Sequence, residues 1–126
     1  GEGNERINGL DDQVEEDGSN FSVGQRQLIV IARALLSECS IVLMDEATAA
    51  IDVDTDEKIQ QAMRTEFKNA TCITVAHRIN TIMDSTHILV MGDGMKLEFD
   101  SPAALLAKEG GNFRELVDAY ESSHLA

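Results

Sequence analysis

The feature that most constrains the fold is an apolar run that ends in two adjacent acids, Ile41-Val42-Leu43-Met44-Asp45-Glu46. A short uninterrupted apolar run predicts a strand buried on both faces, as strands of parallel sheets are. In open α/β sheets, ligands bind where such strands end. Carboxylates there suit a hard cation and a water, because Mg²⁺ prefers oxygen ligands and a free carboxylate can take a proton. The hexapeptide alone fits a solvated acidic loop equally well.

Length and charge narrow the class of protein. The chain has 126 residues, 43% of them hydrophobic, which corresponds to one domain or part of one with a core. Its formal net charge of -13 argues against direct nucleic-acid binding, which needs a basic face. Cys39 and Cys72 lack metal-ligand spacing, so we expect reduced thiols. No apolar run reaches the ~18 residues of a membrane-spanning helix, and no signal peptide is expected.

A helix is predicted after an acidic, glycine-containing lead-in over residues 1–20. Ser22 and Gln25 have the spacing of a capping box, and the helix is expected to reach about Ser37. Gly24 in its first turn weakens a helix by up to ~1 kcal/mol, but it lets a ligand approach the backbone closely. A hydroxyl and free N–H groups at a helix start can bind phosphate, although an ordinary capped helix is the commoner case.

The residues after the acid pair predict a βαβ unit. A loop to Asp54 precedes a helix from about Thr55 to Phe67, and Cys72 to Val75 form a second strand. A βαβ unit takes about 30 or more residues, so these two strands are predicted to be parallel. His77 would then follow the second strand at the sheet edge where Glu46 follows the first. A hydrogen-bonded histidine that only ends a strand is the commoner case.

The remainder predicts an α/β arrangement of short elements. We expect a helix over 78–84, strands over 87–91 and 95–99 joined at Gly92-Asp93-Gly94, a helix starting at Pro102 and a helix over 112–121.

The order of these features resembles the ATP-binding cassette (ABC) ATPases. Phe21-Ser22-Val23-Gly24-Gln25 resembles the cassette signature, and Ile41 to Glu46 resembles Walker B with its adjoining glutamate. Ala49-Ala50-Ile51-Asp52 resembles the D-loop, and His77 resembles the switch histidine. The sequences of these motifs, together with Glu98-Phe99-Asp100-Ser101-Pro102, are most similar to those of the second cassette of the multidrug-resistance-associated (C) subfamily.

The resemblance implies a P-loop NTPase-like α/β fold, with a mostly parallel sheet and flanking helices. Residues 1–20 would be the acidic lead-in, 21–37 the signature helix of the helical subdomain, and 38–126 the C-terminal part of the RecA-like ATPase core. No G-x-x-x-x-G-K-[ST] loop occurs in the sequence, so the Walker A half would be absent. We expect a C-terminal part of a cassette, without appreciable ATPase activity alone.

The resemblance also implies a role for each matching residue. Asp45 would hold Mg²⁺ through water, Glu46 would act as general base, and His77 would contact the γ-phosphate of ATP. Ser22-Val23-Gly24-Gln25 would cap the γ-phosphate of a nucleotide bound mainly to a partner cassette, and Asp52 would lie at the interface between cassettes. Val23 departs from the commonest signature, which has glycine there.

The implied function is an ATP-hydrolysing cassette at the cytoplasmic face of a membrane exporter of organic anions or conjugates. Its partners would be a second cassette, paired head to tail around ATP, and the transmembrane domains of the same transporter. A chromosome-maintenance or translation-type ATPase is one alternative, against which the acidic charge and the lack of a heptad run weigh. A catalytically silent cassette is another, against which the presence of both Glu46 and His77 weighs.

Overall fold

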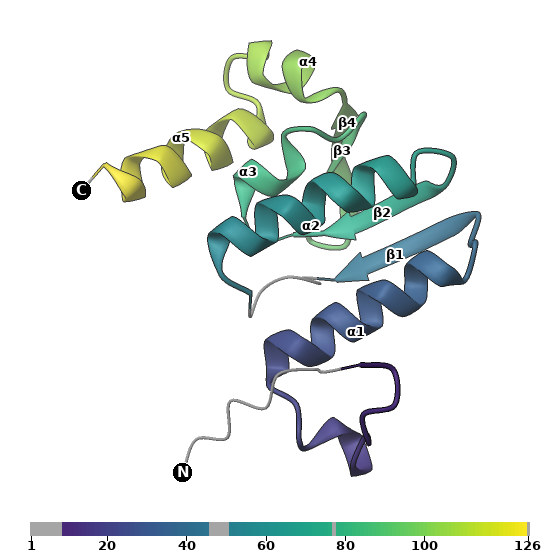
Figure 1. The fold of residues 1–126 in the computed structure, drawn as a ribbon. Coiled ribbons are helices and arrows are strands. Elements are labelled where there is room, and N and C mark those ends of the chain that lie inside the picture. Colours follow the sequence, from purple (N-terminus) through teal and green to yellow (C-terminus); the bar gives the residue numbers. More distant parts are fainter. Residues whose placement is uncertain (1–8, 46–50, 77, 126) are drawn as a thin grey trace. The chain divides into compact units, whose positions relative to one another are not determined.

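The computed structural model describes residues 9–45, 51–76 and 78–125, and its elements are shown in Figure 1. The chain divides into two compact units, Gly1–Val75 and Ala76–Ala126.

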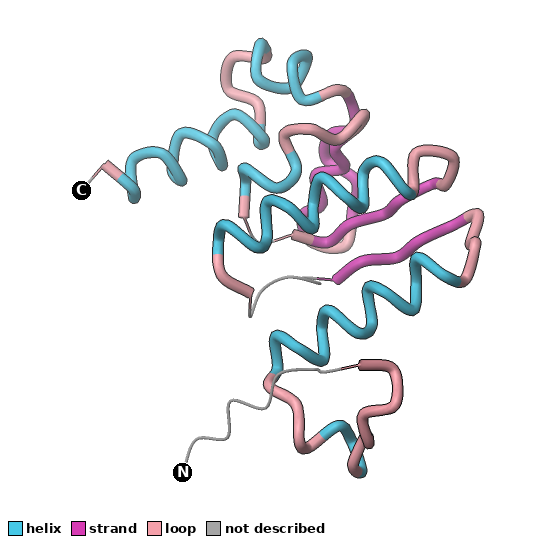
Figure 2. Tube along the Cα trace, in the orientation of Figure 1, coloured by secondary structure: helices cyan, strands magenta, loops and turns pink. Residues whose placement is uncertain are grey.

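The first unit consists of two helices on a two-stranded parallel sheet. Its elements are a 3-10 turn η1 (Glu16–Gly18), helix α1 (Val23–Leu36), strand β1 (Ile41–Asp45), helix α2 (Val53–Glu66) and strand β2 (Thr71–Val75). The strands run side by side in Figure 2, and their register sets Val42 opposite Cys72 and Asp45 opposite Val75. The predicted parallel βαβ unit is therefore confirmed.

Both helices of this unit pack on the same face of the sheet. The buried cluster takes its members from α1, β1 and the end of α2: Ile31, Val42, Met63 and Phe67. Met44 packs against this cluster from β1. Because successive side chains of a strand point to opposite faces, Val42 and Met44 meet the helices while Ile41 and Leu43 point away from them.

Among the described residues of the first unit, helices cover one face of β1, whereas the apolar run predicted burial on both faces. Ile41 is 63% exposed and Leu43 is 74% exposed. On β2, Ile73 and Val75 are each 55% exposed and extend this bare face. The apolar run formed a strand, but both covering helices lie on the opposite face of the sheet.

The second unit is built around an antiparallel hairpin. Its elements are α3 (Ile79–Ile82), β3 (Ile88–Gly92), β4 (Met95–Asp100), α4 (Pro102–Ala107) and α5 (Asn112–His124). Asp93 and Gly94 join β3 to β4 with φ angles of 48° and 75°, the left-handed values of the turn expected for an Asp-Gly pair. The buried core of this unit comprises Ile88, Val90, Leu105, Phe113 and Val117.

A buried acid organises the start of α5. Glu98 on β4 is 5% exposed and accepts hydrogen bonds from the Phe113 N–H and from Lys108 Nζ, each at 2.9 Å. The first of these bonds satisfies a donor in the first turn of α5, whose N-cap Gly111 has no side chain to do so. The Phe113 N–H, followed by Lys108, holds the pKa of Glu98 below its ordinary value.

Element boundaries differ from the predictions by a few residues, for local reasons. α2 begins at Val53 rather than Thr55, because the side chain of Asp52 accepts the Thr55 N–H and caps the helix. Pro102 starts α4 as predicted, after the N-cap Ser101. α3 is shorter than the predicted 78–84, and α5 continues three residues beyond 121.

Cys39 and Cys72 are free, and both are exposed rather than part of a core. Across the described ranges, none of the helices combines the length and apolar character that crossing a membrane requires.

Candidate functional site

The start of α1 carries the predicted capping box. Ser22 Oγ accepts the N–H of Gln25 at 3.2 Å, and Gln25 Oε1 accepts the N–H of Ser22 at 2.8 Å. Ser22 is exposed, and a hydroxyl has one proton besides its two acceptor lone pairs. Ser22 can therefore cap the helix and at the same time donate its proton to a ligand.

Backbone donors accompany this hydroxyl in the first turn of α1. The Gln25 N–H is bonded to Ser22 Oγ, and the Arg26 N–H is bonded to the Ser22 carbonyl at 2.9 Å. The N–H groups of Val23 and Gly24 have no acceptor among the residues that the structure describes. Such orphan donors at the positive end of a helix dipole form a surface that favours an anion.

One amide side chain closes the segment that leads into this helix. Asn20 Nδ2 donates to the carbonyl of Gln13 at 2.8 Å, and Asn20 Oδ1 accepts the N–H of Glu15 at 3.1 Å. We predicted only an acidic loop here and gave Asn20 no role. A sequence signal existed, because asparagine side chains near turns commonly bond to the backbone of their own segment.

Arg26 ties the same segment to α1. Its Nη1 donates to the carbonyl of Asp17 at 3.3 Å. Its aliphatic stem lies against Gly18, where a Cβ would stand 3.1 Å from Arg26 Cδ. Gly18 also has a φ of +65°, a conformation that favours glycine. The lead-in and the helix start are thus one hydrogen-bonded structure.

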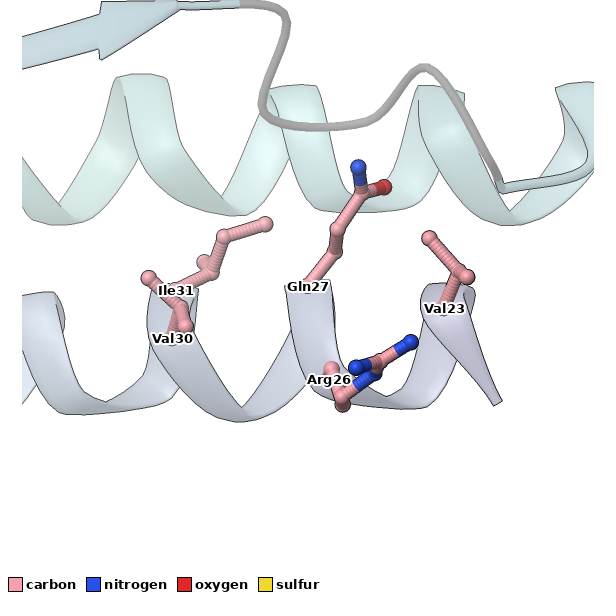
Figure 3. A pocket seen from close by; sticks show the side chains of 5 residues that line it. All are labelled: Val23, Arg26, Gln27, Val30 and Ile31. Carbon is pink, nitrogen blue, oxygen red and sulfur yellow. The ribbon is translucent and has the colours of Figure 1, made fainter. Parts of the chain in front are cut away.

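A hollow of about 320 Å³ lies along α1, and Figure 3 shows the five side chains that line it. They are Val23, Arg26, Gln27, Val30 and Ile31. Three of these side chains are aliphatic, and the guanidinium of Arg26 is engaged by the Asp17 carbonyl. Of the five lining residues, Val23 belongs to the signature motif, and its side chain is 54% exposed.

The second group of predicted site residues belongs to the sheet edge. Asp45 is exposed at the end of β1, opposite Val75 at the end of β2, so both strands end at one edge as predicted. Glu46 and His77 follow these strands in sequence, but they lie outside the described residues and their placement stays a prediction. Within the described residues, no three His, Cys, Asp or Glu side chains group as a metal site. One carboxylate still fits Mg²⁺, which keeps several waters and binds substrate phosphates.

The third predicted position, Asp52, is the N-cap of α2. Its Oδ2 accepts the Thr55 N–H at 3.0 Å. This backbone bond, followed by one from the Thr55 side chain, holds the pKa of Asp52 below its ordinary value. Its expected place at an interface between cassettes stays a prediction.

Hydrogen bonds and ion pairs do not connect these positions within the described part of the chain. Ser22 bonds to Gln25 and Arg26 of its own helix, and Asp52 bonds to Thr55 and Asp56 of its own helix. Asp45 is at the end of a strand. The start of α1, the end of β1 and the start of α2 therefore each present polar groups, and no described hydrogen bond joins these three places.

Known proteins are similar to this chain in sequence and in fold. The model of the ABC transporter family matches residues 3–49. Over 102 residues, 81% of the chain, it is 57% identical to the human ATP-binding cassette sub-family C member 3. Over 113 residues, 90% of the chain, it is 50% identical to ABC transporter C family member 5 of Arabidopsis thaliana. The chain belongs to the ATP-binding cassette family.

Further comparisons fit an ABC cassette of the C subfamily, as the signature wording predicted. The metal resistance protein YCF1 of Saccharomyces cerevisiae is 53% identical over 108 residues, 86% of the chain. The chain spans only 7% or 8% of the length of these three relatives. It also resembles the structure of a bacterial Atm1-family ABC exporter with ATP bound, with a TM-score of 0.82 and 37% identity over 91% of this chain and 20% of the exporter. The predicted α/β cassette fold is confirmed.

Proposed function

We propose that this ABC cassette segment serves ATP-driven export across a membrane, as part of the nucleotide-binding domain most like the second cassette of the multidrug-resistance-associated subfamily. The observation that carries the proposal is the exposed, capped start of α1, where the Ser22 hydroxyl and the N–H groups of Val23 and Gly24 can reach a phosphate. Similarity to an exporter structure with ATP bound supports the nucleotide.

The signature residues are proposed to act on ATP held by a partner cassette. In this arrangement Ser22-Val23-Gly24-Gln25 meets the γ-phosphate, and Asp52 lies at the junction of the two cassettes. One observation supports it: no hydrogen bond among the described residues joins Ser22 to Asp45, so the signature and the sheet edge can serve different nucleotides.

The edge of the β1–β2 sheet is proposed to carry the hydrolytic groups of the same cassette. Asp45 would hold Mg²⁺, Glu46 would accept a proton from the attacking water, and His77 would contact the γ-phosphate. Mg²⁺, when bound with ATP, neutralises charge on the phosphates. The parallel register that ends both strands at Asp45 and Val75 supports a common edge.

The proposed setting is a membrane transporter, with this cassette on the cytoplasmic face and transmembrane domains elsewhere in the protein. Those domains would select the substrate, for which the subfamily suggests organic anions or conjugates. The matched relatives include proteins named as transporters and an exporter, which favours export over a chromosome-maintenance or translation role.

Substitutions of Ser22 in the full-length protein test the contact in trans. Ser22→Ala and Ser22→Gly both remove the hydroxyl, but alanine at an N-cap costs about 1 kcal/mol of helix stability whereas glycine costs only a few tenths. If the hydroxyl binds phosphate, both variants should weaken ATP-dependent crosslinking between cassettes equally, with photolabelling by an ATP analogue unchanged. Parent-like crosslinking in both variants would contradict the contact.

Substitution of Glu46 tests the hydrolytic role. Glu46→Gln should keep ATP binding and lose turnover, because a positioned general base is worth about 10²–10⁴ in rate. Glu57→Gln, at an exposed position of α2, is the matched control. Hydrolysis by the Glu46 variant at near the parent rate would remove Glu46 from this role.

A further inference from the structure

Resting on the proposed function, we infer that Asn20 is a positioning residue for the phosphate-binding start of α1. Asn20 touches no reacting group in this scheme. It fixes the path by which the chain reaches Ser22, and with it the direction of the Ser22 hydroxyl and of the first-turn N–H groups.

The two bonds of Asn20 determine the orientation of its amide. Its NH₂ group faces the carbonyl of Gln13, which can only accept, and its oxygen faces the N–H of Glu15, which can only donate. The opposite orientation would set oxygen against oxygen and N–H against N–H. An aspartate at this position could keep the Glu15 bond but would bring a carboxylate oxygen against the Gln13 carbonyl.

The two hydrogen bonds of Asn20 to Gln13 and Glu15, the Asn20 clamp, lie directly upstream of the signature motif. One residue, Phe21, separates Asn20 from Ser22, and Phe21 is 9% exposed with its N–H bonded to the Gly18 carbonyl at 2.9 Å. The chain is thus held before Ser22 by the amide of Asn20 and the ring of Phe21. It is held after Ser22 by the bond from the Gln25 N–H to Ser22 Oγ. Of these three, the Asn20 bonds reach Gln13 and Glu15, and Glu15 is also bonded to Gly18 and Ser19.

Such support matters for a phosphate ligand because catalysis by positioning tolerates little displacement. A misplacement of about 1 Å can cost on the order of 10²-fold in rate. Losing the clamp leaves the Arg26–Asp17 bond in place, so we expect a partial effect. The expected result for Asn20→Ala is about a tenfold rise in the ATP concentration that half-maximally pairs the cassettes, in line with the net value of one to two hydrogen bonds.

The experiment uses the full-length transporter and measures ATP-dependent crosslinking, photolabelling by an ATP analogue and thermal unfolding for each variant. Asn20→Ala and Asn20→Asp should shift pairing while photolabelling stays at the parent value and the unfolding midpoint falls only slightly, because one to two hydrogen bonds are a small part of the stability of the full-length protein. Gln13→Ala is the matched control, because Asn20 uses only the backbone carbonyl of Gln13. Parallel losses in pairing, labelling and thermal stability would overturn positioning in favour of a merely structural role.

A second pair of variants breaks the clamp without altering Asn20. Glu15 has a φ of -74°, which proline can adopt, so Glu15→Pro removes the N–H that Asn20 accepts while Glu15→Ala retains it. Both variants lose the bond from Ser19 Oγ to Glu15 Oε2, so the difference between them isolates the Glu15 N–H. Glu15→Pro should weaken pairing as Asn20→Ala does, and by more than Glu15→Ala does. If Ser22→Ala weakens pairing but neither clamp variant does, the inference on Asn20 is wrong and the proposed function stands. If Ser22→Ala and Ser22→Gly also pair normally, both fail.

Discussion

Replacing Met63 by alanine should unfold the first unit more readily, because this side chain connects both helices to the sheet. Met63 is 4% exposed and shares a buried cluster with Ile31 of α1, Val42 of β1 and Phe67 at the end of α2. No other buried residue of α2 itself faces this cluster within the described residues. Truncating Met63 should therefore weaken the packing between α2, which Asp52 caps, and β1, which ends at Asp45.

The magnitude follows from two contributions to the free energy of unfolding. Full burial of a methionine side chain contributes about 1.5–3 kcal/mol, most of which alanine forfeits. The unfilled space adds about 24 cal/mol per Å³, so a residual cavity of about 50 Å³ adds about 1 kcal/mol. The expected loss is about 2–4 kcal/mol, within the range for buried methionine-to-alanine substitutions.

Urea unfolding of the chain, followed by far-UV circular dichroism, measures this loss. Met63→Leu conserves volume and should cost less than about 1.5 kcal/mol. Gln61→Ala changes an exposed side chain of the same helix and should stay within about 0.5 kcal/mol of the parent. A loss below about 1 kcal/mol for Met63→Ala, or equal losses for the alanine and leucine variants, would refute the packing argument.

Two further predictions concern the second unit. The pKa of Glu98 is lowered in the folded chain, so its bonds to Phe113 and Lys108 stabilise the fold above the unfolded pKa of about 4.3, and this stabilisation is lost as pH falls through the folded pKa. Glu98→Gln should flatten the urea midpoint against pH in that acid range, and an unchanged slope would refute the linkage. Gly111→Ala should lower the thermal midpoint more than Gly92→Ala, although the second contact is closer. A Cβ on Gly111 would stand 3.0 Å from Glu98 Oε1 and 3.1 Å from the Lys108 backbone carbonyl, whereas one on Gly92 would stand 2.6 Å from Leu97 Cδ1, the end of an exposed side chain that can move. Equal midpoints would contradict this ranking.

Elements governed by local rules could be predicted from the sequence. Ser22 and Gln25 form the capping box that their spacing indicates, and Asp93-Gly94 forms the hairpin turn. In each case the residues that decide the conformation lie within a few positions of one another, so a linear pattern contains the needed information.

Burial of β1 could not be predicted in the same way. Val42 and Leu43 are neighbouring aliphatic residues, yet one is 8% exposed and the other 74%. An apolar run indicates that a strand can be covered on both faces, but whether a second covering layer exists depends on elements far from the strand. In the described chain, α1 and α2 both pack on the Val42 side.

The candidate site divides along the same line. The ligand capacity of Ser22 follows from the motif, because its cap partner is three residues away. Asn20 could not be assigned a function, because its partners Gln13 and Glu15 are set by the folded path of the lead-in. The roles of Glu46 and His77 stay predictions from motif and order.

The bare face of the β1–β2 sheet has a consequence for the behaviour of the chain in solution. This face has an exposed apolar surface that favours association, formed by Ile41, Leu43, Ile73 and Val75. The strand edges beside it lack a further partner among the described residues. A net charge of -13 opposes self-association by mutual repulsion. Salt shortens the range of that repulsion to about 10 Å at 0.1 M, without covering the apolar surface. Charge repulsion therefore opposes aggregation of the isolated segment, and the exposed face of the sheet favours it. We expect aggregation to increase as the ionic strength is raised.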